Sequence, residues 1–185
     1  HTRYISVTGV QTCALPISRP AGRREVTITR SRQAVGDWAT LRDLELKEGA
    51  GSIAVPPGAY GEFKVHEHGM LVLGVAGART AATYSFQKLE LKSGAALAVV
   101  GPVVLALGDG LEMEYGVLGE IAHPEWLALR FASDGLELKE GARVFADVLA
   151  PKGEVVIGNR AELTGGLGSS RLTVRRNGIL RLRAP

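Results

Sequence analysis

A seven-residue pattern, Leu-Glu-Leu-Lys-x-Gly-Ala, occurs three times in this chain of 185 residues. The copies occupy residues 44–50, 89–95 and 136–142, so they follow one another at intervals of 45 and 47 residues. Similarity at a fixed period of this size is typical of architectures that stack one structural unit on the next. Each copy alternates apolar and charged residues and then reaches Gly, which predicts a β-strand followed by a corner. The repeat therefore predicts how the chain is built, but it points to no ligand and no reaction.

The same alternation continues along most of the chain and predicts strands whose apolar side chains point inward. Helical spacing is not sustained anywhere, and only residues 122–129 could hold a single helical turn. We therefore expect an all-β domain. The inward pairs include Phe63/Val65, Leu71/Leu73, Leu97/Val99, Leu127/Leu129, Val155/Ile157, Leu172/Val174 and Leu180/Leu182.

The strand spacing favours a right-handed β-solenoid (β-helix) of short coils. Strand starts lie roughly 15 to 27 residues apart, a length that fits one coil. The copies of the repeat would then lie two coils apart. Since neighbouring strands are about 4.8 Å apart, Glu45, Glu90 and Glu137 would not stack directly on one another, which would be unfavourable.

A β-sandwich or jelly roll is the alternative all-β fold. It would contain antiparallel hairpins with two-residue Asn-Gly or Asp-Gly turns. The chain offers Asp109-Gly110, Asp134-Gly135 and Asn177-Gly178, so this alternative stays open at the level of the sequence.

The first eighteen residues resemble the in-frame translation of a common short-read sequencing adapter. Residues 7–18 read Val-Thr-Gly-Val-Gln-Thr-Cys-Ala-Leu-Pro-Ile-Ser, and residues 1–3 fit the same oligonucleotide. We interpret residues 1–18 as an adapter-derived artefact that is not native, and we exclude them from fold reasoning. Cys13, the one cysteine, lies inside this segment, so we expect no native disulfide or thiolate metal site. We also expect the native N-terminus to be missing, which leaves the absence of a targeting signal uninformative.

The remaining chain divides into a basic lead-in or linker over residues 19–40 and a β-solenoid domain over residues 41–185. Without Arg3 the formal charge falls from +3 to +2, which is too small to indicate a nucleic-acid partner. No apolar run approaches the roughly 20 residues of a membrane helix. With 24 Gly and only 5% aromatic residues, the composition suits many short strands joined by tight corners.

The C-terminal third carries a family resemblance. Residues 150–159 read Ala-Pro-Lys-Gly-Glu-Val-Val-Ile-Gly-Asn, residues 163–167 read Leu-Thr-Gly-Gly-Leu, and Leu-Thr-Val and Asn-Gly follow at 172–174 and 177–178. Over about residues 143–182 this pattern resembles uncharacterised bacterial surface β-helix modules of the adhesin, polymer-forming or anchor-associated type. The resemblance implies a structural or adhesive part of a secreted or cell-surface protein. The stackable repeat and the basic end of the chain suggest end-to-end self-association or a surface polysaccharide as partner. It carries no catalytic residues and no cofactor.

His66 and His68 are the weak candidates for a metal site. Two histidines two positions apart on a strand would share one face and could chelate a transition metal. They have the same parity as Glu62 and Lys64, so a solvated outer face is the simpler interpretation. No Glu follows at the spacing of a cupin-type motif, and we expect no native metal.

Catalysis would require convergent polar residues. Glu112, Glu114 and Glu120 could suggest the paired carboxylates of a glycosidase, but no cluster of further polar residues accompanies them. We therefore expect a non-enzymatic module, with a carbohydrate-binding or carbohydrate-active β-helix (a polysaccharide lyase or hydrolase) as the alternative. A groove that combines carboxylates with aromatic side chains would favour this alternative; the candidate aromatics are Trp38, Tyr84, Tyr115 and Trp126.

The end of the chain is basic and is a weak candidate for binding a polyanion. The simpler interpretation is a charged terminal strand that discourages aggregation from edge to edge. The aromatic interleaving of nucleic-acid platforms is absent from it. The candidate residues are Arg171, Arg175, Arg176, Arg181 and Arg183.

Overall fold

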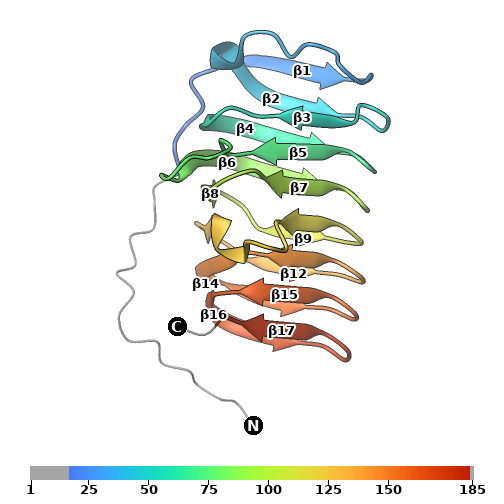
Figure 1. Ribbon diagram of the computed structural model, residues 1–185, viewed down its shortest axis with the longest axis vertical. Helices are drawn as coiled ribbons and strands as arrows, with labels where there is room; N and C mark the ends of the chain where they lie inside the picture. The colour runs from blue at the N-terminus through green and yellow to red at the C-terminus, as the bar shows by residue number, and fades with distance from the viewer. Residues whose placement is uncertain (1–16, 184–185) are drawn as a thin grey trace.

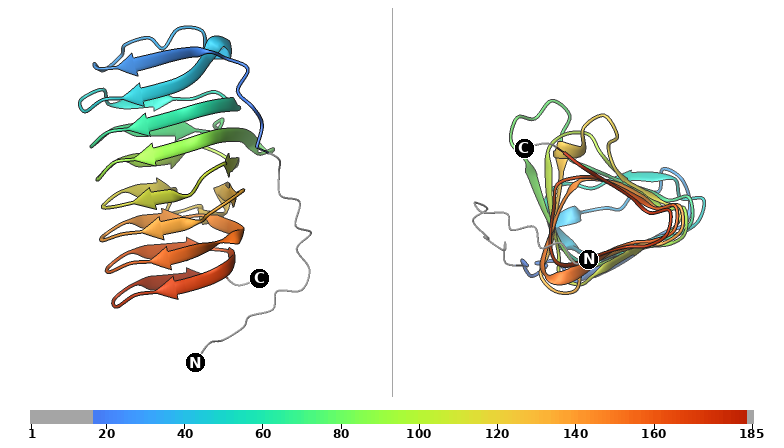
Figure 2. Two further views of the ribbon diagram at one scale, coloured as in Figure 1. Left: turned by 180° about the vertical axis from the view of Figure 1, so that it is seen from behind. Right: turned by 90° about the horizontal axis from the view of Figure 1, so that it is seen from below.

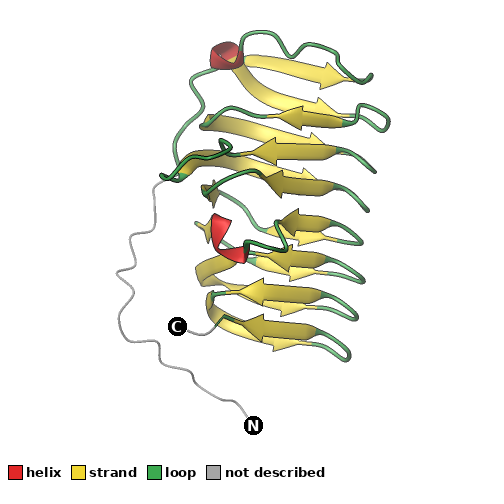
Figure 3. Cartoon of the chain, viewed as in Figure 1, coloured by secondary structure: helices red, strands yellow, loops and turns green. Residues whose placement is uncertain are grey.

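The computed structural model describes residues 17–183, which form a stack of strands with two short 3-10 turns, η1 (Trp38–Thr40) and η2 (Pro124–Trp126) (Figures 1 and 3). The prediction of an all-β fold is confirmed. The turn expected within residues 122–129 is η2. Most of the adapter-like segment, residues 1–16, lies outside the described residues. The strands are β1 (Arg24–Ile28), β2 (Leu41–Leu46), β3 (Ser52–Ala54), β4 (Gly58–Val65), β5 (Met70–Leu73), β6 (Ala82–Leu91), β7 (Ala96–Val99), β8 (Val103–Leu107), β9 (Leu111–Met113), β10 (Val117–Gly119), β11 (Leu127–Phe131), β12 (Leu136–Leu138), β13 (Arg143–Phe145), β14 (Asp147–Ile157), β15 (Glu162–Gly165), β16 (Leu167–Val174) and β17 (Ile179–Leu182).

The strands form two parallel sheets. One has the order β1-β2-β4-β6-β8-β11-β14-β12-β9, with β16 also paired to β14, and the other has the order β17-β15-β13-β10-β7-β5-β3. Seen along the stack, strands from successive levels superpose on a roughly triangular outline (Figure 2). Parallel pairing of this kind is compatible with a β-helix. Neither helical turn in residues 17–183 has the length and apolarity of a membrane span.

The hairpins of the sandwich alternative do not form, since the pairings among the described strands are parallel. Asp134-Gly135 joins β11 to β12, but these two strands do not pair with each other. Strand β11 pairs with β8 and β14, and strand β12 pairs with β9 and β14. A type I′ hairpin needs positive φ at both central residues. Here only the first has it, with φ of 50° at Asp134 and 61° at Asn177, so both dipeptides make corners.

The register shows what the 45-residue interval of the repeat spans. Leu44 pairs with Phe63, and Phe63 pairs with Leu89. Glu45 and Glu90 are therefore two pairing steps apart, and Lys64 lies between them. In the later copy, Glu137 has Glu112 as its register neighbour.

The core is a continuous apolar column between the sheets, in which Tyr60, Phe63 and Phe86 form an aromatic cluster with ring centroids 4.6 to 5.5 Å apart. Ser85 is the one buried polar residue of the described chain, and each buried polar side-chain atom there has a hydrogen-bond partner. The predicted inward positions are buried up to Leu163, but Leu172 and Val174 are 42% and 45% exposed. They belong to the last level of the stack, where a strand covers them on one side only.

The N-terminal end of the core is closed by a loop. The Arg24 guanidinium donates to the carbonyl oxygens of Val35 and Asp37, at 2.8 and 2.7 Å, and to Thr40 Oγ1 at 3.1 Å. Val35 is only 8% exposed, and Trp38 packs edge-on against a core tyrosine. The sheet thus begins at Arg24, inside the segment that the sequence suggested as a lead-in or linker.

Tight corners hold successive levels close together. A Cβ added at Gly153 would lie 1.1 Å from the carbonyl oxygen of Asp134. At Gly94, by contrast, φ is +75° but a Cβ would meet no atom within 4 Å. The two glycines serve different needs: close approach of backbones at Gly153 and left-handed conformation at Gly94.

Candidate functional site

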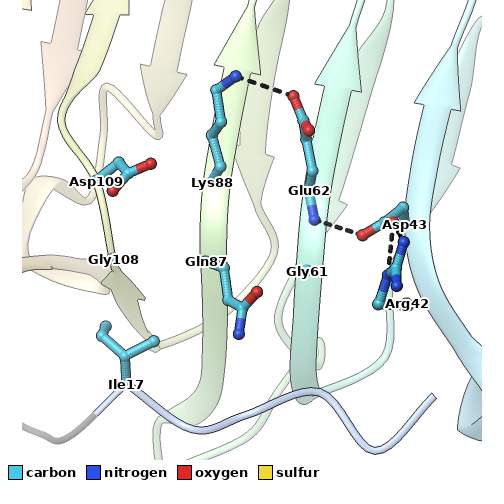
Figure 4. A pocket seen from close by; sticks show the side chains of 9 residues that line it. All are labelled: Ile17, Arg42, Asp43, Gly61, Glu62, Gln87, Lys88, Gly108 and Asp109. Atoms are coloured by element: carbon cyan, nitrogen blue, oxygen red, sulfur yellow. Dashed lines mark hydrogen bonds and ion pairs between the residues drawn. The ribbon is translucent and has the colours of Figure 1, made fainter. Parts of the chain in front are cut away.

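A groove with a volume of about 460 Å³ lies at one corner of the stack. It crosses β2, β4, β6 and β8, where Gly61 and Gly108 leave room, and the segment around Ile17 lies along one side (Figure 4). Hereafter this is the corner groove. Its lining residues are Ile17, Arg42, Asp43, Gly61, Glu62, Gln87, Lys88, Gly108 and Asp109.

Four charged residues of the corner groove, Arg42, Asp43, Glu62 and Lys88, form ion pairs or hydrogen bonds with one another. Asp43 accepts hydrogen bonds from the backbone N–H of Glu62 at 2.8 Å and from Arg42 Nε at 2.7 Å. Lys88 Nζ donates to Glu62 Oε1 at 3.0 Å. These contacts raise the pKa of Arg42, chiefly through Asp43, and that of Lys88, chiefly through Glu62. Both cations therefore stay charged at neutral pH, and the groove offers fixed hydrogen-bonding groups.

A smaller hollow of about 290 Å³ adjoins the groove on the outer face of β1, β2 and β4. It is rich in carboxylates, which come from Glu25, Asp43, Glu45 and Glu62. Lys64 is the one cation in its lining. No group of three or more potential ligands with metal-binding geometry occurs within residues 17–183.

His66 and His68 do not share a strand face, contrary to the sequence-based expectation. Strand β4 ends at Val65, and the backbone N–H of Gly69 donates to the His66 carbonyl oxygen at 3.0 Å, closing a turn. His68 has φ of 59° in this turn, so alternation no longer applies. The His66 ring nitrogen Nε2 lies 2.7 Å from Glu45 Oε1.

The three glutamates considered for catalysis do not converge on one another, and two of them have local partners. Glu112 forms an ion pair with Lys139. Glu114 follows the end of β9 and is exposed. Glu120 accepts a hydrogen bond from the backbone N–H of Ala122 at 3.3 Å.

The four aromatic residues that would favour a carbohydrate groove are also dispersed. Tyr84 is fully buried and donates to the Val55 carbonyl oxygen at 2.9 Å. Trp126 stacks on His123, with centroids 4.1 Å apart. Trp38 packs against the core, whereas Tyr115 is 56% exposed. None of the four lines the corner groove or the adjoining hollow.

The arginines of the basic end do gather, because all of them lie on or beside β16 and β17. Arg175 pairs with Glu137 at 3.7 Å, Arg181 with Glu162 at 3.3 Å, and Arg183 with Asp147 at 3.1 Å. Within residues 17–183, Arg171 and Arg176 have no ion pair. Every acidic partner lies on an earlier level of the stack.

Sequence reasoning missed the corner groove, including Arg42, Gln87 and Lys88. One signal was available: polar residues recur at 42–43, 62, 87–88 and 109, near the spacing of the strands. Only the register shows that these positions fall on one corner.

Comparisons with models of protein families, with curated proteins and with solved structures give no match. The function is therefore argued from the chemistry of the chain itself.

Proposed function

We propose that this chain is a non-enzymatic structural or adhesive module of a secreted or cell-surface bacterial protein, built as a right-handed β-solenoid of short coils. The observation that supports it is the way in which outward charges pair from strand to strand. Lys88 contacts Glu62 at 3.0 Å and Lys64 contacts Glu90 at 3.9 Å. These charged side chains pair with neighbours along the stack instead of converging on one site where a substrate could bind.

The same architecture supplies rigidity. Exposed ion pairs contribute only about 0–1 kcal/mol each, so the stiffness comes mainly from the continuous apolar column and the parallel ladders. A spacer or an adhesive rod needs this property and no catalytic centre. End-to-end self-association and binding of a surface polysaccharide stay predictions.

Two measurements on the purified chain test the proposal. Small-angle scattering is expected to fit a rigid elongated particle, and a panel of neutral and acidic polysaccharides is expected to yield no cleavage products. Cleavage that disappears in Glu112→Gln but persists in Glu48→Gln, an exposed control, would refute the non-enzymatic assignment.

A carbohydrate-binding β-helix is the second candidate, and the corner groove is the observation that favours it. Its amide and charged groups can hydrogen-bond sugar hydroxyls. Under this alternative, binding on a glycan array would be lost in Gln87→Ala and kept in Gln33→Ala, which lies outside the groove. If no glycan binds at millimolar concentration, the groove is not a sugar site.

The adapter origin of residues 1–18 is also a proposal. It is supported by the codon-level resemblance, and it is tested by sequencing the gene across codon 18 from unamplified DNA. We expect different codons in place of those for residues 1–18. Recovery of the same eighteen residues would overturn this interpretation.

A further inference from the structure

Four neighbouring strands of the second sheet, β3, β5, β7 and β10, contain no charged residue (Figure 1). Their inward positions include Leu71, Leu97 and Leu118, which are fully buried. The positions between them point outward and form a surface that we call the apolar face. By contrast, outward positions on the first sheet hold charges such as Glu45 and Lys64. The side chains of the apolar face are Ser52, Ala54, Met70, Val72, Ala96, Ala98 and Val117.

Exposed large apolar side chains gather on and around this face. Among residues 17–171, all of them lie on its four strands or in the loops beside these strands. Val117 is on β10, and Tyr115 and Ile121 lie just before and after that strand. Val75 and Val100 follow β5 and β7, and the five residues are 39% to 61% exposed. A contiguous apolar surface of this kind marks an interaction site.

Large and small side chains alternate from level to level of the apolar face. Met70 of β5 lies beside Ala96 of β7 in the register, and Val117 of β10 lies on the other side of Ala96. Val72 likewise lies beside Ala98. A two-fold axis parallel to the strands, between β5 and β7, would set β5 of one copy over β7 of another. Met70 would then meet Ala96, and Val72 would meet Ala98, so that large side chains pack against small ones as in a protein core.

The other two-fold arrangement, with the two stacks parallel, fits less well. Each strand would face the same strand of the second copy, so Met70 would meet Val72 while the alanines of β7 would leave a gap. The contact would also include β13 and β15, where Arg143 pairs with Glu162 at 3.5 Å, and burial of an ion pair carries a desolvation cost. With antiparallel stacks, β13 and β15 lie beyond β3 of the second copy. Size and charge therefore select the same orientation.

The area of the apolar face sets the strength of such a contact. Four levels at about 4.8 Å span about 19 Å, and five residues at about 3.3 Å span about 17 Å along the strands. With the bordering side chains, two copies would bury roughly 700–1,000 Å² in total, which is the range of weak, reversible complexes. A two-fold contact uses the same patch on both copies and is closed, so assembly through it stops at a dimer.

Charge at the border argues against a membrane as the occupant. The segments that flank the four strands contain more carboxylates than cations, and anionic lipid attracts basic segments instead. The carboxylates are Glu48, Glu67, Glu114, Glu120 and Glu125, and the cations are Lys47, Arg79 and Lys92.

We propose that the apolar face joins two copies of this chain side by side, in a weak dimer whose stacks run antiparallel. The contact is lateral, so it is distinct from end-to-end addition of coils. It holds whether or not the module also binds a ligand, and it therefore goes beyond the proposed function.

Sedimentation velocity of the full chain from about 5 to 500 µM, a range suited to weak complexes, tests the proposal. A reducing buffer keeps Cys13 from linking two chains. We expect a reversible change from monomer to dimer and no larger species. The dissociation constant should change less than about twofold in 0.5 M NaCl, because the contact contains no charged pair.

A matched pair of variants tests the surface. Val72→Glu is expected to weaken the dimer at least about thirtyfold, because it would bury two carboxylates. Val104→Glu makes the same change at a partly exposed outward position of β8 on the first sheet, and it should leave the dimer unchanged. Far-UV circular dichroism and thermal melts check that both variants fold. Val72→Thr keeps the shape of the side chain and is expected to weaken the dimer at least about threefold, should Val72→Glu unfold the chain.

Size variants test the orientation. Met70→Ala and Ala96→Met are each expected to weaken the dimer at least about fivefold, the first by leaving gaps and the second by setting large side chains against each other. The double variant exchanges large and small and should return to within about threefold of the parent chain. With parallel stacks, Ala96→Met alone would fill a gap and strengthen the dimer.

A monomer throughout the concentration range, or a dimer that Val72→Glu leaves intact, would refute the lateral contact. Stronger association of Ala96→Met would refute the antiparallel orientation. A monomer that floats with vesicles of phosphatidylcholine and phosphatidylglycerol would assign the apolar face to a membrane instead. Species larger than a dimer that persist in Val72→Glu would assign association to the ends of the stack.

Discussion

Reversing the charge of Lys64 is expected to destabilise the fold by about 1–3 kcal/mol, more than removing the charge does. Lys64 lies between Glu45 and Glu90 in the strand register, and its Nζ is 3.9 Å from Glu90 Oε2. Lys64→Glu would place three carboxylates on successive strands. That arrangement is the direct stacking which the spacing of the repeat avoids.

The size of this expected loss of stability follows from the spacing between strands. Unit charges about 4.8 Å apart interact by about 3.5 kcal/mol at an effective dielectric constant of 20 and by about 0.9 kcal/mol in water. The side chains of Lys64, Glu45 and Glu90 are 35%, 30% and 27% exposed, so solvent screening brings each pair toward the lower figure. Two new repulsions and one lost attraction then sum to about 1–3 kcal/mol, while Lys64→Gln should cost about 0.5 kcal/mol or less.

Urea unfolding followed by far-UV circular dichroism measures the free energy of unfolding. Lys152→Glu is the matched control, since Lys152 is exposed and has no ion pair within residues 17–183; it should cost under about 0.5 kcal/mol. The excess cost of Lys64→Glu is expected to shrink in 1 M NaCl. If Lys64→Glu costs no more than Lys152→Glu at low salt, Glu45 and Glu90 do not flank this position and the register is wrong.

Three further predictions concern the corners and the titration of single groups. Gly153→Ala is expected to lower the free energy of unfolding by more than about 4 kcal/mol, because the backbone of the facing corner must move by about 2 Å. Gly94→Ala should lower it by about 1–2 kcal/mol, from the left-handed conformation alone. Equal urea midpoints for the two variants would contradict this prediction. The hydrogen bond from Lys92 lowers the pKa of Glu90 in the folded state, so its contribution to stability is present above the unfolded pKa and is lost as the pH falls through the folded value. Urea midpoints of Glu90→Gln should therefore depend less on pH between 5 and 3 than those of the parent chain. Burial raises the pKa of Tyr60 to about 12, so stability should fall as the pH rises from about 10 toward 12. Burial also raises the pKa of Tyr84, so thermal melts of Tyr60→Phe should show a smaller slope than those of the parent chain.

Local alternation was enough to predict the strands and the inward positions of most of the stack. Phe63 and Leu129 are apolar at the right parity, and burial on both sides by neighbouring strands enforces that parity. The same alternation wrongly predicted that Leu172 is buried, because burial at this position depends on whether another level of the stack covers the strand. Local sequence carries no such information.

The candidate site was harder to predict because it depends on register. Arg42 and Lys88 are 46 positions apart in the sequence yet line one groove, since corners from successive levels align. The prediction that His66 and His68 share a strand face failed for a related reason. Strand β4 ends at Val65, directly before His66, and no local pattern indicates where the strand ends. Element ends and cross-strand alignment are tertiary properties, and isolated motifs do not encode them.

The segment leading into β1 decides how the chain would respond to force. Residues 19–23 lead along the flank of the stack into β1, and the Arg23 N–H donates to the Thr40 carbonyl oxygen at 3.0 Å. A pull on this side would break this contact first and would then separate β1 from β2, one hydrogen bond at a time. Pulling along the strands would instead have to shear many hydrogen bonds at once. The flank that receives the chain is therefore its mechanically weak side, and a tether attached there would yield before the sheets slide.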